Sequence, residues 1–261
     1  MNKTFRKIFV EDKNTSKLIK SFNGLSAFVI LALIFIFSVY KINYKFDFSS
    51  ILPYKNKIIK AYATTLMIGI FSMIGALIIG TVMAIFKRSK YMILKYFSKL
   101  YIELIRGTPF LIQIFFFYFI IATAFGLNNK YILGCIILAV FSGAYVTEII
   151  RGGLESISMS QHLSADSLGF TIFQKYRYVI FPQVIKRILP ALTGQLSTLI
   201  KDSSLLSVIA VSELSMNILE IDSLNFHTFE NLTLLGILYL TITIPISILS
   251  KKLERKYHYE T

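Results

Sequence analysis

The stretch Gln161–Pro190, QHLSADSLGFTIFQKYRYVIFPQVIKRILP, decides how the rest of the chain is interpreted. It is the one long segment that is too highly charged to lie in lipid, because the other long segments are nearly uncharged. Its charged residues are Asp166, Lys175, Arg177, Lys186 and Arg187. A single charge at the centre of a membrane helix costs about 2.5–3.5 kcal/mol or more. The stretch is therefore expected to stand outside a membrane-embedded body, where a soluble protein could reach it.

The local pattern of this stretch predicts two short helices joined by a glycine. The first is expected from about Ser160 to Leu168 and ends at Gly169, which can adopt the left-handed conformation that closes a helix. The second begins at Thr171, which forms a capping-box pair with Gln174. Apolar residues then recur at helical spacing and predict one apolar face, with Lys175 and Arg177 opposite it: Ile172, Phe173, Tyr176, Val179 and Ile180. Pro182 is expected to mark a helix boundary.

The composition indicates an all-α integral membrane protein. Hydrophobic residues make up 55% of the 261 residues and the mean hydropathy is +0.64, whereas soluble domains contain roughly 45–50% apolar residues. The net charge of +14 comes from Lys and Arg at the ends of apolar runs, a pattern typical of membrane flanks and not of nucleic-acid binding. The only cysteine, Cys135, offers neither a disulfide nor a cysteine-based metal site, and we expect no metal site.

Crossing a membrane takes about 20 apolar residues in a helix, and six runs approach that length. The predicted spans are Leu25–Tyr40, Ala63–Phe86, Pro109–Leu127, Tyr131–Ile150, Ile185–Val211 and Leu232–Leu249. The first resembles a signal peptide in its basic flank, but no small-residue cleavage site follows it, so we expect a retained helix. The predicted division is an N-terminal cytoplasmic segment with an extra helix at 1–50, followed by one membrane domain at 51–261. Gly69, Ser72, Ala76 and Gly80 are expected to form a helix-packing face of the second span.

The distribution of basic residues predicts that both termini are cytoplasmic. Segments 1–24, 87–108, 151–187 and 250–261 contain 6, 6, 5 and 4 Lys or Arg residues, against 5, 1 and none in 41–62, 126–130 and 212–230. The positive-inside rule then makes 151–187 cytoplasmic, although the five lysines of 41–62 argue the other way. Segment 212–230 carries Glu213, Glu220, Asp222 and Glu230, which indicates either a solvated acidic loop or a docking surface for an external partner.

The stretch around Gly169 resembles the cytoplasmic coupling loop of ABC importer permeases, whose pattern is Glu-Ala-Ala, three residues, Gly, nine residues, then Ile-x-Leu-Pro. Leu163, Ser164 and Ala165 stand at the Glu-Ala-Ala positions, and Gly169 and Pro182 match. Leu163 replaces the family Glu and Ser164 replaces one Ala. By this resemblance, the residues that would couple the chain to an ATPase are Leu163, Ser164, Ala165, Asp166, Gly169 and Pro182.

Three further motifs extend the resemblance, in order, from about Pro53 to Lys252: Arg106–Pro109, Ala144–Gly153 and Lys201–Leu205. They are similar to segments of the importer permeases for histidine, glutamine, glutamate and arginine. The resemblance implies a five-helix permease core in a bacterial plasma membrane. It also implies two ATPase subunits that use ATP and Mg, a second copy or a similar permease, an external binding protein and an amino acid substrate.

Charged and polar residues inside the spans are candidates for a substrate path or gate: Glu148, Lys201, Asp202 and Ser203. Glu148 and Arg151 lie three residues apart and can form an ion pair on one helix face. Lys201 and Asp202 follow Pro190 and Gly194 in a span where broken helices commonly border a transport path. The alternative is that they form an internal ion pair with no role in transport.

No phosphate-binding loop and no catalytic residue set is present, so the chain is expected not to be an enzyme, and the ATPase must be a separate subunit. The chain itself is expected to carry no cofactor. The alternatives are a self-contained secondary transporter or channel for small polar solutes, and a membrane scaffold without transport. The coupling-loop pattern and the absence of an internal repeat favour the importer.

Overall fold

The computed structural model describes residues 16–42 and 44–257, which form helices and short connections without any strand in these ranges. The chain divides into two compact units, Met1–Asp47 and Phe48–Thr261. Residues 1–15 of the predicted cytoplasmic segment and the last four residues of the predicted membrane domain lie outside the described ranges. The division of function between 1–50 and 51–261 stays a prediction.

The first unit contains helix α2, Lys17–Ile42, which includes the predicted span Leu25–Tyr40. Its 26 residues extend about 39 Å at 1.5 Å per residue, more than the ~30 Å hydrocarbon core. Its large apolar side chains are exposed, for example Phe28 at 69% and Phe35 at 65%. The helix is long and apolar enough to cross a membrane.

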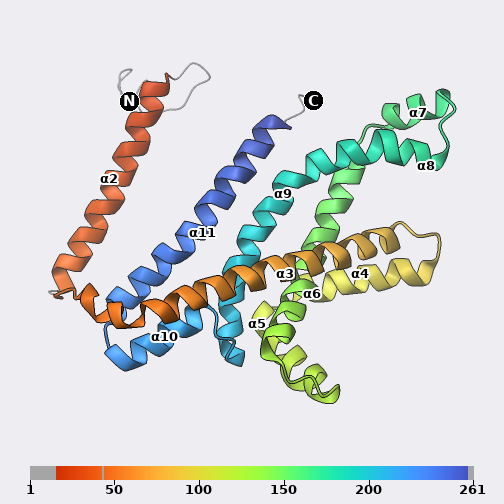
Figure 1. The fold of residues 1–261 in the computed structure, drawn as a ribbon. Coiled ribbons are helices and arrows are strands. Elements are labelled where there is room, and N and C mark those ends of the chain that lie inside the picture. The colour runs from red at the N-terminus through yellow and green to blue at the C-terminus, as the bar shows by residue number, and fades with distance from the viewer. Residues whose placement is uncertain (1–15, 43, 258–261) are drawn as a thin grey trace. The chain divides into compact units, whose positions relative to one another are not determined.

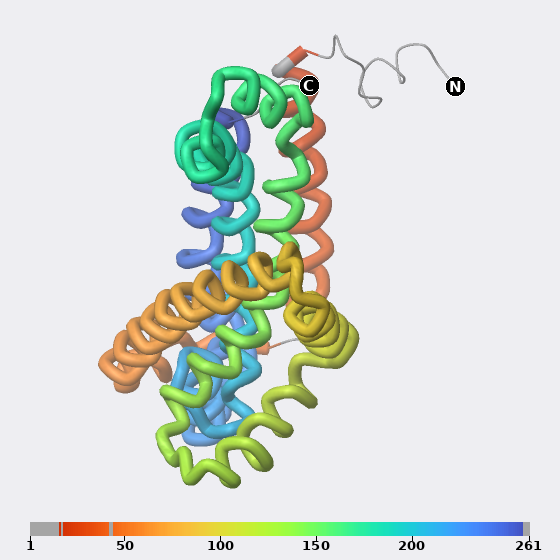
Figure 2. The backbone as a smooth tube through the Cα atoms, turned by 90° about the vertical axis from the view of Figure 1, so that its right-hand side faces the viewer, coloured from red at the N-terminus to blue at the C-terminus, as the bar shows by residue number. Residues whose placement is uncertain are grey.

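The second unit is a helical bundle whose polar loop and acidic helix lie at opposite ends (Figures 1 and 2). Helices α7 and α8 form one end, and α10 lies at the other. Its elements are η1 (Phe48–Tyr54), α3 (Lys55–Lys87), α4 (Met92–Gly107), α5 (Phe110–Phe115), η2 (Phe116–Ala122), α6 (Lys130–Glu155), α7 (Met159–Ser167), α8 (Ile172–Gln174), η3 (Lys175–Ile180), α9 (Phe181–Asp202), η4 (Ser203–Ile209), α10 (Leu214–Asn225) and α11 (Thr228–Lys256).

Small residues allow α3, α6 and α9 to pack closely. Gly69, Ser72, Ala76 and Gly80 of α3 are all buried, which confirms the predicted packing face. A Cβ atom at Gly69 would lie 2.8 Å from a side-chain carbon of Ile200, and one at Gly80 would lie 2.5 Å from Val146. Such contacts are too close for any residue larger than glycine without movement of a neighbour, so the glycines set the distance between the helices.

Four of the described helices are long and apolar enough to cross a membrane, and the number reaches the predicted six if each of two bent helix pairs forms one span. One bent pair is α4 with α5 and η2, bent by 114°. Pro109 explains the position of this bend because it restricts Thr108 to an extended backbone, with φ −121° and ψ 149°. Segment 87–108, which was predicted only as a cytoplasmic connection between spans, is mostly helical, because Met92–Gly107 form α4. Helix α4 packs against α3, where the Ser98 hydroxyl donates a 2.8 Å hydrogen bond to the carbonyl of Met83.

The prediction that 212–230 is a solvated acidic loop is also wrong. Residues 214–225 form α10, and Glu213 and Glu230 are fully buried. Glu213 caps α10, because its carboxylate accepts hydrogen bonds from the backbone N–H groups of Ser215 and Met216 at 2.9 and 2.7 Å. Glu220 pairs at 2.5 Å with Lys57 of α3, one of the five lysines that seemed misplaced in an outer loop.

Candidate functional site

The polar two-helix loop has the closed geometry that its sequence predicts. Gly169 has φ +75°, and its N–H donates to the carbonyl of Asp166 at 3.0 Å. The N–H of Phe170 donates to the carbonyl of Ala165 at 3.1 Å, so α7 ends in a Schellman motif. The predicted left-handed glycine is confirmed, and it turns the chain at a fixed angle into the next helix.

The capping box at the start of α8 is confirmed. The Thr171 hydroxyl accepts from the N–H of Gln174 at 3.3 Å, and the Gln174 side chain accepts from the N–H of Thr171 at 2.9 Å. An ion pair then joins α7 to the helical turn η3, because Lys175 Nζ lies 2.7 and 2.9 Å from the two carboxylate oxygens of Asp166. The cap, the glycine and the ion pair together fix the angle between α7 and the helix that follows.

The six predicted coupling residues do not share one environment. Leu163 is 55% exposed, and Ser164, Asp166 and Gly169 are also exposed. Ala165 is buried and Pro182 is partly buried, so these two support the loop from within. A coupling role for this set stays a prediction.

The predicted apolar face after Thr171 is only partly correct. Tyr176, Val179 and Ile180 pack with Ile157, Val184 and neighbouring side chains. Ile172 and Phe173 are each 75% exposed instead. Residues 175–180 form a π-helical turn, whose i→i+5 pairing changes the helical period, so residues spaced for an α-helix no longer share one face.

Pro182 lies at a boundary between two helical segments, as predicted, although the chain does not leave the helix there. It lies in the first turn of α9, directly after the π-helical turn η3, and the chain continues as one helix from Ile172 to Ile209. A proline is tolerated at this position because the first N–H groups of a helix lack an intrahelical partner in any case.

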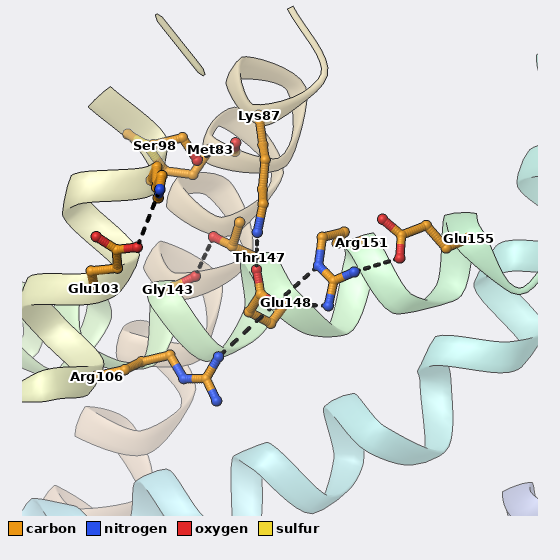
Figure 3. Close-up of polar contacts among 11 residues, drawn as sticks. Met83, Lys87, Ser98, Glu103, Arg106, Gly143, Thr147, Glu148, Arg151 and Glu155 are labelled. Carbon is orange, nitrogen blue, oxygen red and sulfur yellow. Dashed lines mark hydrogen bonds and ion pairs between the residues drawn. The ribbon is translucent and has the colours of Figure 1, made fainter. Parts of the chain in front are cut away.

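Glu148 lies at the centre of a charge network near the end of α6 that leads to the loop (Figure 3). Its carboxylate is 2.6 Å from Lys87 Nζ of α3, 2.9 Å from Arg151 and 3.9 Å from Arg106 of α4. The predicted pair with Arg151 is confirmed. Arg151 also bonds Glu155, and Arg106 stacks over the ring of Tyr145 at 5.4 Å. Three helices are thus joined through one carboxylate, whose side chain is 20% exposed.

Lys201, Asp202 and Ser203 mark the transition from α9 to the tighter turn η4. Lys201 is exposed, Asp202 is partly buried, and the buried Ser203 hydroxyl donates to the carbonyl of Ile200 at 2.7 Å. No salt bridge joins Lys201 to Asp202 in the part of the chain that the structure describes. Consecutive residues point in different directions on a helix, so the two side chains do not contact each other directly. An ion pair without a role in transport stays the alternative to a substrate path.

The four candidate path residues fall into two separate places. Helices α6 and α9 run antiparallel, since Gly153 meets Ile188 while Gly134 meets Leu206. At 1.5 Å per residue, this pairing places Glu148 about 15 Å along α6 from the level of Asp202. Glu148 therefore does not form one site with Lys201, Asp202 and Ser203.

A buried polar cluster near Ser203 was missed by the sequence reasoning. Tyr239 of α11 donates to Glu213 at 3.0 Å, and its hydroxyl also lies 3.0 Å from that of Ser215. Thr65 of α3 accepts from the N–H of Leu214 at 3.0 Å. The cluster ties α3, α10 and α11 together beside the end of α9, where η4 begins at Ser203. The Glu-Leu-Ser start of α10 was its only local signal, because the other partners come from distant helices.

A helical membrane body with a rigid, polar two-helix loop at one end defines the class of the protein, an integral membrane protein of the permease type. Residues 76–259 match the family model of the "Binding-protein-dependent transport system inner membrane component". This match covers most of the chain, and the chain belongs to that family. The resemblance to importer permeases is confirmed.

Several relatives support this assignment. The chain is 34% identical over 214 residues to the glutamine transport system permease protein GlnP of Escherichia coli K12, covering 81% of this chain and 98% of the relative. It is 29% identical over 211 residues to the arginine transport system permease protein ArtQ of Bacillus subtilis, covering 80% of this chain and 96% of that relative.

Solved structures agree with the family assignment. The crystal structure of an amino acid ABC transporter with histidines superimposes with a TM-score of 0.75 at 34% identity, covering 82% of this chain and all of the other. A methionine ABC transporter in inward-facing conformations superimposes with a TM-score of 0.62 at 17% identity. The match covers 77% of this chain and 94% of the other, which shows a shared fold.

Proposed function

We propose that this chain is the membrane-spanning subunit of an importer that takes up a polar amino acid through ATP hydrolysis by a separate ATPase. An external binding protein would deliver the substrate. Two ATPase subunits would use ATP and Mg, and a second copy of this chain or a similar permease would complete the pathway in the bacterial plasma membrane. The names of the glutamine and arginine transport relatives support an amino acid substrate.

The rigid geometry of the loop carries this proposal. A force applied to α7 by a closing ATPase reaches the membrane helices only if the loop does not bend. The Schellman motif at Gly169, the Thr171 cap and the Asp166–Lys175 ion pair all resist bending. The loop follows α6 after three non-helical residues, 156–158, and its second helix runs on into α9 without interruption. Its movement would therefore be passed directly to α9 as a rigid body.

The break after α9 supports a substrate path at Lys201, Asp202 and Ser203. The α-helix ends at Asp202 and a tighter turn follows, so this helix changes its geometry inside the bundle. Broken helices in transporters commonly place polar groups at the substrate route. Glu148 is proposed as a gate residue, because it joins α3, α4 and α6 at the end nearest the coupling loop.

The proposal is tested with the complete complex in proteoliposomes. The binding protein is loaded with glutamine, arginine, histidine or glutamate, and ATP hydrolysis and uptake are measured for each. We expect one or a few of these amino acids to stimulate both. Uptake driven by a proton or sodium gradient without ATP would overturn the proposal and favour a secondary transporter.

A further inference from the structure

A basic pocket lies where the turn between α3 and α4 meets the end of α6. Its volume is about 350 Å³, and its lining residues are Lys87, Arg88, Lys95, Tyr96, Lys99, Arg151 and Glu155. Five of these side chains are cationic and one is anionic. The pocket lies apart from the loop surface and from the end of α9. Lys87 and Arg151 also hold Glu148, whereas Arg88, Lys95 and Lys99 have no part in the proposed transport function.

The positive charge of this pocket is only partly neutralised by the protein. Lys87 and Arg151 share Glu148, and Arg151 also bonds Glu155. Lys99 lies 3.8 Å from Glu103 in a pair that is 61% exposed at both ends and contributes little. Neither Arg88 nor Lys95 forms a salt bridge within residues 16–42 and 44–257. Within the described residues, the pocket therefore holds two cations without an acidic partner, Lys99 with a weak exposed partner, and two cations that carboxylates hold in place.

The side of α4 next to this pocket is apolar and exposed. Ile93 is 80% exposed, Phe97 54% and Leu100 57%. Tyr96, which lines the pocket, is 56% exposed, and tyrosine favours the boundary between hydrocarbon and water. A soluble anion would use the cations and leave these side chains uncovered. A ligand with an anionic head and acyl chains would use both.

We propose that this pocket binds the headgroup of an anionic phospholipid. The phosphate would lie between Arg88 and Lys95, with Lys99 beside it, and the acyl chains would follow the exposed apolar side of α4. Basic pockets between membrane helices are suited to such headgroups, and each Lys or Arg near an anionic membrane surface contributes on the order of a fivefold gain in binding. Removing two of these cations is therefore expected to weaken binding by roughly 25-fold.

The test measures lipid retention directly. The purified full-length complex is titrated with phosphatidylglycerol or phosphatidylcholine, and bound lipids are counted by native mass spectrometry. Wild type should retain phosphatidylglycerol in preference to phosphatidylcholine. Arg88→Gln with Lys95→Gln should lose this preference. The matched control is Lys251→Gln with Lys252→Gln, which removes the same charge from exposed positions at the end of α11 and should keep it.

Two further arms identify the ligand and exclude misfolding. Arg88→Lys with Lys95→Arg should retain phosphatidylglycerol, because both cations remain. Free glycerol phosphate at the same concentration should not displace the lipid. Equal loss in the pocket and control variants, or displacement by free glycerol phosphate, would overturn the proposal. Lipid retention needs no transport measurement, so failure here is distinguishable from failure of the importer function.

Discussion

The Lys87 ammonium at the end of α3 lies 2.6 Å from a carboxylate oxygen of Glu148 in α6, although 61 residues separate the two. Arg106 and Arg151 approach the same carboxylate from α4 and from the next turn of α6. One acidic side chain thus holds three cations together at the end of α6 that continues into the coupling loop.

Replacing Glu148 by Gln should destabilise the membrane domain by about 1–2 kcal/mol. The variant leaves three cations without their shared partner, and the groups are partly exposed, so the loss is smaller than for a fully buried pair. Thermal stability in detergent, followed by size-exclusion chromatography, measures the effect. Glu103→Gln is the control, because the Glu103 side chain is 61% exposed and forms a single long ion pair, 3.8 Å from Lys99. A Glu103 variant as unstable as the Glu148 variant would contradict the network.

Gly153→Ala should separate α6 from α9 and cost about 1–3 kcal/mol, because the new Cβ would lie 2.2 Å from a methyl carbon of Ile188. Its neighbour Gly152 provides a matched control, since nothing lies within 4 Å of a Cβ there. Gly152→Ala should leave stability unchanged or slightly raise it. Thermal stability and the yield of folded protein distinguish the two variants. Similar behaviour of both would show that the approach of the helices is not limiting.

Gly169→Val should disturb the coupling loop without disturbing membrane insertion. At φ +75° a β-branched residue is strained by about 1–2 kcal/mol, although the space around Gly169 is open. We expect weaker association with the ATPase and loss of uptake. Gly169→Asn is the control, because asparagine tolerates the left-handed conformation. Full uptake by the Val variant would show that the loop does not transmit ATPase closure.

Lys201→Met and Asp202→Asn should each leave assembly intact, because no salt bridge joins the two side chains in the described part of the chain. If they border the substrate path, Asp202→Asn changes uptake per assembled complex more than it changes the amount of complex. Both quantities are measured for each single variant and for the double variant. Unstable single variants whose assembly and transport are restored in the double variant would instead indicate a structural pair.

The predicted orientation places α7 in the cytoplasm and α10 outside. In a Cys135→Ala background, Ser160→Cys and Ser223→Cys introduce exposed thiols at the two ends of the second unit. In intact cells, a reagent that does not cross membranes should label residue 223 and not residue 160. Labelling in broken cells confirms that both thiols react. Labelling of residue 160 from outside would reverse the orientation and remove the basis for ATPase docking on the loop.

The sequence alone determined features whose causes lie within a few residues. Span length and apolar composition identified a membrane protein, since both reflect the solvent that surrounds each helix. The left-handed Gly169 and the capping box of Thr171 with Gln174 were predictable, because their hydrogen bonds join residues at most five positions apart. The motif order around the coupling loop also identified the family.

Only the tertiary structure decided which distant groups meet. Lys87 and Arg106 reach Glu148 because the turn between α3 and α4 brings both against α6, which no local pattern specifies. Glu213 is buried and not solvated, because Tyr239 and the first N–H groups of α10 satisfy its carboxylate. Packing in three dimensions supplies these partners, and it determines whether a charge is exposed, paired or buried.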